Sequence, residues 1–454
     1  MKPYPIGMFV LAACASDPAP HDAAPQPAAQ LASASKTAPQ AETAEPVAKP
    51  QEEPAAPEPE PAVRSDGPPT LNLSTLGRCS RAGLSAVGDE VFMHRSRTIH
   101  RMGPEGTPVQ DFPFTLPLTH APKDDVGRGA TGFGGLYGRW PDQLFAVVDY
   151  SERDFTSTKL ARWADDDWVA VKTLDRSAQY SKAWPWHSNS VLAFAVTIRS
   201  RDGAETPRLA VVRGAPKGPK LGGVLGKAGC RDAYDAVLAV DVDADGPVSA
   251  VVSCKTTWLA QWPKDGTAGT TTLLSRSPSD GAELALAHGG EGFVLLRGKK
   301  ARLFAWHDGQ ADKLDRPKQQ AVKTIALDAD GALWVVQRDA INVWREGTWH
   351  PESLPPGSAI EQLAGTQVGD PWLFRRDKSV WNRTADGAWN PVALPPAGPQ
   401  GKIPRPLQLI VPRAGDAWVS GEYFKLREGA KNVGRRFEAV YTQRPVETPY
   451  NCAP

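Results

Sequence analysis

Residues 324–356 read TIALDADGALWVVQRDAINVWREGTWHPESLPP, and residues 361–396 read EQLAGTQVGDPWLFRRDKSVWNRTADGAWNPVALPP. Both stretches have a tryptophan after a glycine-containing turn, two more tryptophans around a second turn, and a closing proline pair. Between these markers, short apolar runs alternate with turn residues, which is the pattern of short β-strands joined by hairpins. We therefore interpret each stretch as one structural repeat of about 40 residues.

The same pattern recurs along the rest of the chain with looser spelling. Apolar runs beside Gly or Asp turns occur at residues 88–94, 143–150, 190–196, 246–253, 292–298 and 415–421. Together with the two stretches above they make eight units, whereas helical periodicity is almost absent. Short, evenly spaced strands with a recurring aromatic motif are typical of a β-propeller. We predict an all-β, eight-bladed β-propeller; a seven-bladed propeller and a pair of β-sandwiches are the alternatives.

One unit also resembles known propeller repeats. The stretch LDADGALWVVQ, residues 327–337, is similar to repeats of NHL-type and two-component-regulator propellers, in which D-x-D-G-x-hydrophobic-Trp opens a blade. The resemblance covers this unit well and the following unit in part. It implies the structure of a blade and does not imply an activity.

The N-terminal residues predict a lipoprotein signal. A short apolar run before residue 14 suits a secretory signal and is too short to span a bilayer as a helix. The stretch Leu11-Ala12-Ala13-Cys14 resembles the bacterial lipobox, which implies cleavage of residues 1–13 and acylation of Cys14. Ala15 and Ser16 follow the cysteine, which in Gram-negative lipoproteins resembles sorting to the outer membrane. The alternative is an ordinary secretory signal in which Cys14 has no role.

Residues 14–68 read as a tether between the lipidated cysteine and a folded domain at residues 69–454. From residue 15 onward the segment is rich in Pro, Ala and Glu and has no aromatic residue. Such a chain cannot bury enough apolar surface to offset its ordering entropy, so we expect it to be disordered. Fully extended in a polyproline conformation, it would reach roughly 170 Å. We therefore predict a cell-envelope protein anchored to a membrane through lipid.

The net charge and the cysteines bear on three questions: nucleic-acid binding, disulfide pairing and metal binding. The net charge is +1, and no run of Lys and Arg interleaved with aromatics occurs, so we do not expect nucleic-acid binding. Four cysteines remain besides Cys14, and four cysteines allow three disulfide pairings. We predict a bond between Cys79 and Cys452 that closes the ring, and a local bond between Cys230 and Cys254. No C-x-x-C or C-x-x-H spacing supports metal binding by these cysteines.

Three kinds of short motif could carry chemistry. Residues 127–132, GRGATG, match GxGxxG by spelling, but the following residues 133–143 read as loop, so we interpret the motif as an inter-blade loop. Asp241, Asp243 and Asp245 resemble the start of a calcium loop, a weak candidate because Val252 stands where the bidentate Glu should be. His94, His307 and His350 adjoin predicted hairpin turns, so we expect them to be solvated.

These observations favour a binding or scaffold function. We predict a module that presents one propeller face to a protein or glycan of the cell envelope, acting as a monomer and without a cofactor other than the calcium candidate. A hydrolase or lyase with its site at the channel mouth is the alternative, because propeller enzymes assemble sites from several blades. A third hypothesis is an accessory protein of cell-envelope assembly or sensing.

Overall fold

The computed structural model describes much of the chain from residue 69 onward. The described residues are 69–77, 83–94, 98–113, 130–141, 143–152, 155–164, 166–173, 183–188, 191–199, 205–212, 224, 227–230, 237–242, 247–263, 269–287, 291–298, 301–315, 317, 321–396, 405–426 and 434–452. All of them belong to the second of two units, Pro61–Pro454. No helix among these residues is long and apolar enough to cross a membrane.

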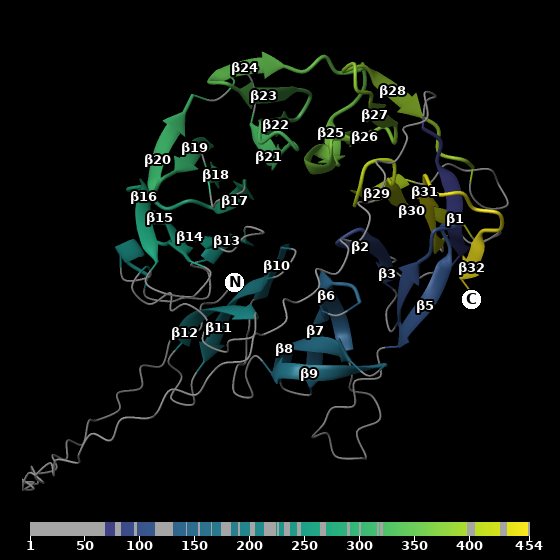
Figure 1. Cartoon of the computed structure of the whole chain (residues 1–454), viewed down its shortest axis with the longest axis horizontal. Coiled ribbons are helices and arrows are strands. Elements are labelled where there is room, and N and C mark those ends of the chain that lie inside the picture. Colours follow the sequence, from purple (N-terminus) through teal and green to yellow (C-terminus); the bar gives the residue numbers. More distant parts are fainter. Residues whose placement is uncertain are drawn as a thin grey trace, which may run out of the picture. The chain divides into compact units, whose positions relative to one another are not determined.

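The described strands form eight sheets (Figure 1). The strands of the first four sheets in chain order are β2 (Gly83–Val87), β3 (Glu90–His94), β4 (Thr98–Met102) and β5 (Pro108–Pro113); β6 (Ala130–Arg139), β7 (Gln143–Glu152), β8 (Phe155–Ala164) and β9 (Asp167–Thr173); β10 (Ala183–Ser188), β11 (Val191–Arg199) and β12 (Glu205–Val212); and β13 (Val237–Val242), β14 (Val248–Ser253), β15 (Thr257–Trp262) and β16 (Thr270–Ser275).

The remaining four sheets include the one that holds both ends of the described chain. Their strands are β17 (Gly281–Leu286), β18 (Gly292–Arg297), β19 (Arg302–His307) and β20 (Gln310–Leu314); β21 (Val322–Leu327), β22 (Leu333–Gln337), β23 (Ile341–Arg345) and β24 (Thr348–Pro351); β25 (Ile360–Ala364), β26 (Trp372–Arg375), β27 (Val380–Arg383) and β28 (Trp389–Val392); and β29 (Arg405–Ile410), β30 (Trp418–Leu426), β31 (Gly434–Thr442), β1 (Asn72–Gly77) and β32 (Tyr450–Cys452). One 3-10 turn, η2 (Thr366–Val368), lies between β25 and β26.

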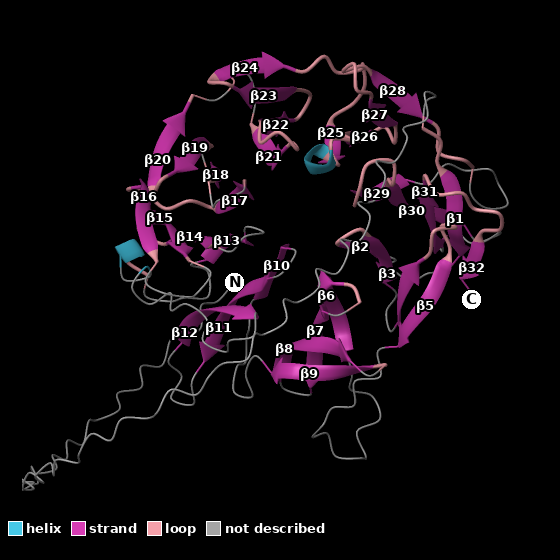
Figure 2. Cartoon of the chain, viewed as in Figure 1, coloured by secondary structure: helices cyan, strands magenta, loops and turns pink. Residues whose placement is uncertain are grey.

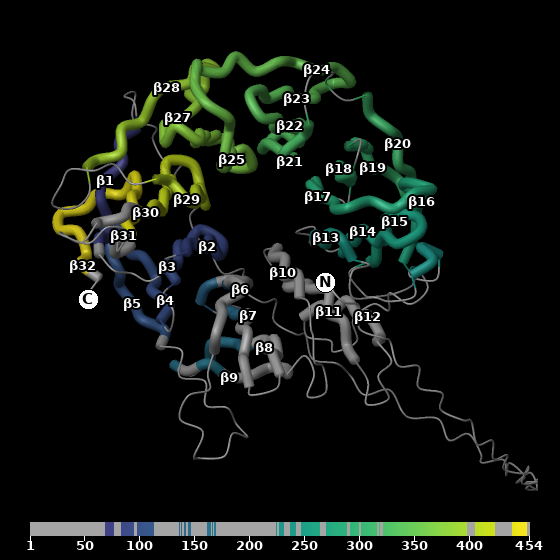
Figure 3. The backbone as a smooth tube through the Cα atoms, turned by 180° about the vertical axis from the view of Figure 1, so that it is seen from behind, coloured from purple at the N-terminus to yellow at the C-terminus, as the bar shows by residue number. Residues whose placement is uncertain are grey.

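In seven of the eight described sheets the strands that follow one another in sequence pair antiparallel, so each of these sheets is a meander, and β29, β30 and β31 of the eighth sheet pair in the same way (Figure 2). The first strand of each sheet lies nearest the centre and the last lies outermost, in both views (Figure 3). Most sheets contact the next through these inner strands, the β21–β24 sheet contacts the next through β22 with β25 and β21 with η2, and β2 contacts β29, so the contacts run round a closed ring. Radially arranged antiparallel meanders are the β-propeller architecture, which confirms the predicted all-β propeller class.

The ring is closed by a sheet that combines the two ends of the described chain. Strand β1 pairs antiparallel with β31, and β32 pairs parallel with β1. Asp416 and Arg444 form a buried bidentate ion pair in this sheet, at 2.6 and 2.9 Å. Arg444 also donates to the carbonyls of Met102 and Gly103 in the neighbouring β2–β5 sheet, at 3.1 and 2.7 Å. The closing sheet is therefore held to its neighbour by a buried guanidinium that makes four hydrogen bonds.

The second strand of each sheet explains why the repeat is visible in the sequence. The recurring apolar segments coincide with β3, β7, β11, β14, β18, β22, β26 and β30. All residues of β14, β22 and β26 are buried, because such a strand is covered on both faces by the adjacent sheets. Consequently the core is a series of clusters, most of them shared by two consecutive sheets, such as Trp334 and Leu373 between the β21–β24 and β25–β28 sheets.

Side chains on the inner strands join consecutive sheets. Gln362 of β25 donates to the carbonyl of Leu409 in β29 and accepts its N–H, at 2.7 and 2.9 Å. Gln408 of β29 makes the same pair of bonds with Leu84 in β2, at 2.7 and 2.8 Å. Each glutamine therefore supplies a donor and an acceptor to one backbone residue of the next sheet, as an added strand would.

Two expectations from the sequence are wrong. The residues after the GxGxxG spelling form strand β6, in which two register shifts absorb the frequent glycines, so this part is not a loop. His94 is not solvated: it ends a second strand, and burial lowers its pKa from 6.5 to about 4. His307 and His350 are exposed, as expected.

Candidate functional site

A pocket of about 530 Å³ lies at the junction of the β21–β24 and β25–β28 sheets. It is lined by the connections β21–β22, β25–β26 and β27–β28, by the residue that follows β24, and by parts of β22, β23, β24 and β27. Pockets of 300–1,000 Å³ are the usual size of small-ligand sites in proteins. The two sheets are the pair whose sequences first indicated a repeat.

One wall of the pocket is built around Asp328. Its Oδ1 accepts the backbone N–H groups of Asp330 and Ala332, at 3.1 and 2.8 Å, which folds the turn between β21 and β22. Its Oδ2 accepts the indole N–H of Trp334 and the Nη2 of Arg345, both at 3.1 Å. The sequence interpretation of this segment as a turn is therefore confirmed, and the same carboxylate positions two side chains of the pocket.

A second part of the lining is built around Arg383 of β27. Its Nε and Nη2 donate to the two carboxylate oxygens of Glu352, at 2.7 and 3.4 Å. Glu352 also accepts the indole N–H of Trp389, at 3.1 Å. The guanidinium carbon of Arg383 lies 5.6 Å from the ring centroid of Trp334, within the range of a cation–π contact. Arg383 therefore crosses the sheet junction and covers the tryptophan, which is 3% exposed.

The connection between β25 and β26 forms a third part of the lining. Gly365 has φ of 79°, and a Cβ there would lie 2.0 Å from the carbonyl oxygen of Asp370, so only glycine fits. The 3-10 turn that follows brings Thr366 and Pro371 to the pocket. Asp370 is buried and holds this connection to the rest of the fold, because it accepts Asn382 Nδ2 at 2.7 Å and the N–H of Gly415 at 2.9 Å.

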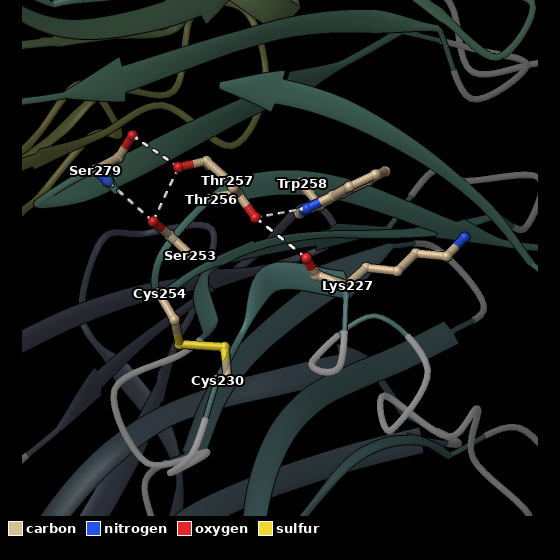
Figure 4. Close-up of a disulfide and its surroundings, with 8 residues drawn as sticks. All are labelled: Lys227, Cys230, Ser253, Cys254, Thr256, Thr257, Trp258 and Ser279. Carbon is tan, nitrogen blue, oxygen red and sulfur yellow. Dashed lines mark hydrogen bonds between the residues drawn. A yellow bond between two sulfur atoms is a disulfide. The ribbon is translucent and has the colours of Figure 1, made fainter. Parts of the chain in front are cut away.

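The cysteines predicted to pair locally form a disulfide. Cys230 and Cys254 are bonded, with their Cα atoms 5.2 Å apart (Figure 4). The N–H groups of Lys255 and Thr256 both donate to the carbonyl of Ala228, at 3.0 and 3.2 Å. On the other side of Cys254, hydroxyl groups of Ser253, Thr257 and Ser279 form a buried hydrogen-bonded cluster. The disulfide therefore fixes the segment before β13 to the turn between β14 and β15.

Other predicted residues lie partly or wholly outside the described part of the chain. Cys14 and Cys79 are outside it, so lipidation and the bond between Cys79 and Cys452 stay predictions; the backbone of Cys452 pairs with Gly77. Asp241 lies in β13, whereas Asp243 and Asp245 are outside the described residues, so the calcium loop also stays a prediction. Among the residues that are described, no three His, Cys, Asp or Glu side chains are placed to hold a metal ion.

The sequence interpretation missed most of the pocket residues. Arg345, Glu352 and Arg383 match no linear motif, because they come from two consecutive repeats and meet only across the junction. A signal was nevertheless present: an arginine follows the aligned tryptophan in both repeats, in VWR (343–345) and VWNR (380–383).

Comparisons with known proteins give no family for this chain. No family model matches it, and no curated protein matches it. Among solved structures, YCF48 bound to D1 peptide is similar at 10% identity, with a TM-score of 0.42, covering 69% of this chain and 92% of that chain. A crystal structure of the eukaryotic initiation factor is similar at 12% identity, with a TM-score of 0.47, covering 84% of this chain and 94% of that chain. The assignment of the fold rests on the strand order and pairing of this chain.

Proposed function

We propose that this protein is a lipid-tethered, eight-bladed β-propeller of the bacterial cell envelope that binds a protein partner. The observation that carries the proposal is the pocket at the junction of the β21–β24 and β25–β28 sheets, where hydrogen-bonding side chains from two sheets surround a concave surface. Eight described sheets, each in contact with the next, support eight blades over seven.

A protein partner fits this pocket better than a glycan does. Sugars are bound through the exposed faces of aromatic rings, and the pocket tryptophan, Trp334, is buried and lies against Arg383. The pocket offers guanidinium N–H donors, and it is lined by connections between strands. Both features suit the backbone and side chains of a peptide.

The proposed location depends on the N-terminal residues. Cleavage after residue 13 and acylation of Cys14 place the propeller at the end of the tether of residues 14–68, on the outer membrane of a Gram-negative cell. A Cys14→Ser variant tests this, because it removes the acylated thiol. The expected result is loss of labelling by a palmitate analogue and release of the protein from the membrane fraction. Continued labelling of the variant would overturn the assignment of Cys14.

The binding site is tested by a photo-crosslinking amino acid placed in living cells at Ala385, an exposed residue of the pocket wall. The matched control carries the crosslinker at Gln310, which is exposed on β20 away from the pocket. The expected result is one protein captured from Ala385 and absent from Gln310, identified by mass spectrometry. If both positions capture the same proteins, or if Ala385 captures none, the pocket is not the docking site.

A further inference from the structure

Two partly buried carboxylates of the pocket have little capacity left for a ligand. Asp328 accepts four hydrogen bonds, two on each oxygen, from two backbone N–H groups, an indole and a guanidinium. Glu352 accepts three, two from Arg383 and one from Trp389. A carboxylate offers about four lone-pair positions. A ligand that approaches with donor groups therefore finds these acceptors already used, apart from one position on Glu352.

The arginines of the pocket, in contrast, have donors to spare. Arg345 uses only Nη2, toward Asp328 at 3.1 Å and Asp330 at 4.0 Å, and its side chain is 51% exposed. Arg383 uses Nε and Nη2 on Glu352. Within the described part of the chain, the Nε and Nη1 of Arg345 and the Nη1 of Arg383 have no acceptor. The hydrogen-bonding character of the pocket is therefore that of a donor, although its carboxylates outnumber its arginines by one.

From this asymmetry we infer that the pocket recognises a carboxylate on an extended, acidic peptide, with Arg345 and Arg383 as the donors, one from each sheet. The inference rests on the proposed function and names the chemistry of the partner. Guanidinium groups bind carboxylates through paired, charge-assisted hydrogen bonds, which gives the recognition its direction as well as its strength. Holding each arginine by a carboxylate at one edge leaves its other edge oriented for the ligand.

Asp330 carries a negative charge beside the proposed binding position, so it should weaken the binding of a carboxylate. Its side chain is 84% exposed and lies 4.0 Å from Arg345, so it faces solvent beside the donor that the ligand would use. A negative charge there repels a carboxylate and attracts a cation. Removing this charge should strengthen binding of an acidic peptide, whereas it should weaken binding of a basic one.

The test is isothermal titration calorimetry on the full chain with three capped peptides that alternate alanine with Glu, Gln or Lys. The expected result is binding of the Glu peptide alone. Arg345→Gln should weaken it about tenfold, the cost of one charge-assisted bond, and Asp330→Asn should strengthen it about threefold. Arg376→Gln is the matched control, since Arg376 is another exposed arginine paired with a carboxylate, Glu361, outside the pocket. Its affinity should equal that of the wild type.

Each other outcome counts against the inference and separates it from the proposed function. Binding of the Lys peptide, weakened by Asp330→Asn, would mean that the pocket takes a cation. Equal binding of all three peptides, or binding of none while crosslinking from Ala385 still captures a partner, would leave the docking site in place and overturn the carboxylate. If neither the Glu peptide nor a crosslinked partner is found, both proposals fail. Circular dichroism of each variant checks that it is folded.

Discussion

The β21–β24 and β25–β28 sheets have nearly the same sequence pattern, yet they satisfy their polar groups in different ways. In the first sheet, Asp328 binds the turn that it begins and the side chains of Trp334 and Arg345, all within one sheet. In the second sheet, Asp370 binds Asn382 of its own sheet and the backbone of Gly415 in the closing sheet. The Asp328 carboxylate therefore binds only within its own sheet, whereas the Asp370 carboxylate also bonds its sheet to the next one.

The hairpins formed by the third and fourth strands of these two sheets also differ. The turn between β23 and β24 consists of Glu346 and Gly347, both with positive φ, and it places Trp344 opposite Trp349 with ring centroids 5.0 Å apart. The turn between β27 and β28 is longer, so Trp381 faces Pro391 instead of a tryptophan. Tryptophans that align in the sequence thus have different partners. The repeat therefore specifies the strands. Turn length decides which side chains face each other in a hairpin, and a few polar residues such as Asp370 decide which sheets are bonded.

The largest expected difference is between a tryptophan on a buried second strand and a tryptophan on an outer hairpin. Trp372→Ala should lower the free energy of unfolding by about 3–5 kcal/mol, because Trp372 is 0% exposed and its removal leaves a cavity. Trp344→Ala should cost only about 1–2 kcal/mol, since this ring is partly exposed and mainly loses its contact with Trp349. Guanidinium titrations of the two variants measure both values. Equal losses in the free energy of unfolding would show that the second strand and the outer hairpin depend equally on their tryptophans.

The second expected difference concerns the bond between sheets. Asp370→Ala should cost about 2–4 kcal/mol, because it leaves the amide of Asn382 and the N–H of Gly415 without their acceptor. Amide hydrogen exchange should speed up at Gly415, in the next sheet. Asp328→Ala is the matched variant, and its effect on exchange should remain within its own sheet. Faster exchange at Gly415 in Asp328→Ala would contradict the contrast between the two sheets.

The same contrast explains what could be predicted from the sequence. The apolar second strands were recognisable, since burial on both faces requires a continuous apolar run such as LWVVQ. The inner strand β6 was harder to recognise, because its frequent glycines are typical of a loop. The pocket could not be predicted, because Glu352 and Arg383 lie 31 residues apart and meet only when one sheet packs on the next.

A smaller effect is expected from the two arginines of the pocket. Arg383→Ala should cost about 1–2 kcal/mol, because it removes the contact with Trp334 and leaves the half-buried Glu352 with only Trp389 as a donor. Arg345→Ala should cost less than about 1 kcal/mol, because the pair it forms with Asp328 is open to solvent at the arginine. The free energies of unfolding of both variants decide the order. A larger loss for Arg345→Ala would mean that the bond within the sheet is the stronger.

The smallest effect is a dependence on acid at the turn between β26 and β27. A hydrogen bond from the hydroxyl of Ser379, together with the N–H of Ser358, lowers the pKa of Asp377 from 3.8 to about 2. Between these pH values the unfolded chain binds more protons than the folded chain, so this contribution is present above pH 3.8 and is lost as the pH falls toward 2. Because the carboxylate is exposed, the contribution should stay below about 1 kcal/mol.

Asp377→Asn isolates this contribution. The variant should be less stable than the wild type at pH 6, and the difference should shrink at pH 3, where the wild-type carboxylate has begun to lose its advantage. Ser379→Ala removes the main cause of the lowered pKa and should reproduce part of the loss at pH 6. Urea titrations of the three proteins at both pH values give the comparison. A loss in Asp377→Asn that is the same at pH 6 and pH 3 would mean that the turn is stabilised by the shape of the side chain and not by its charge.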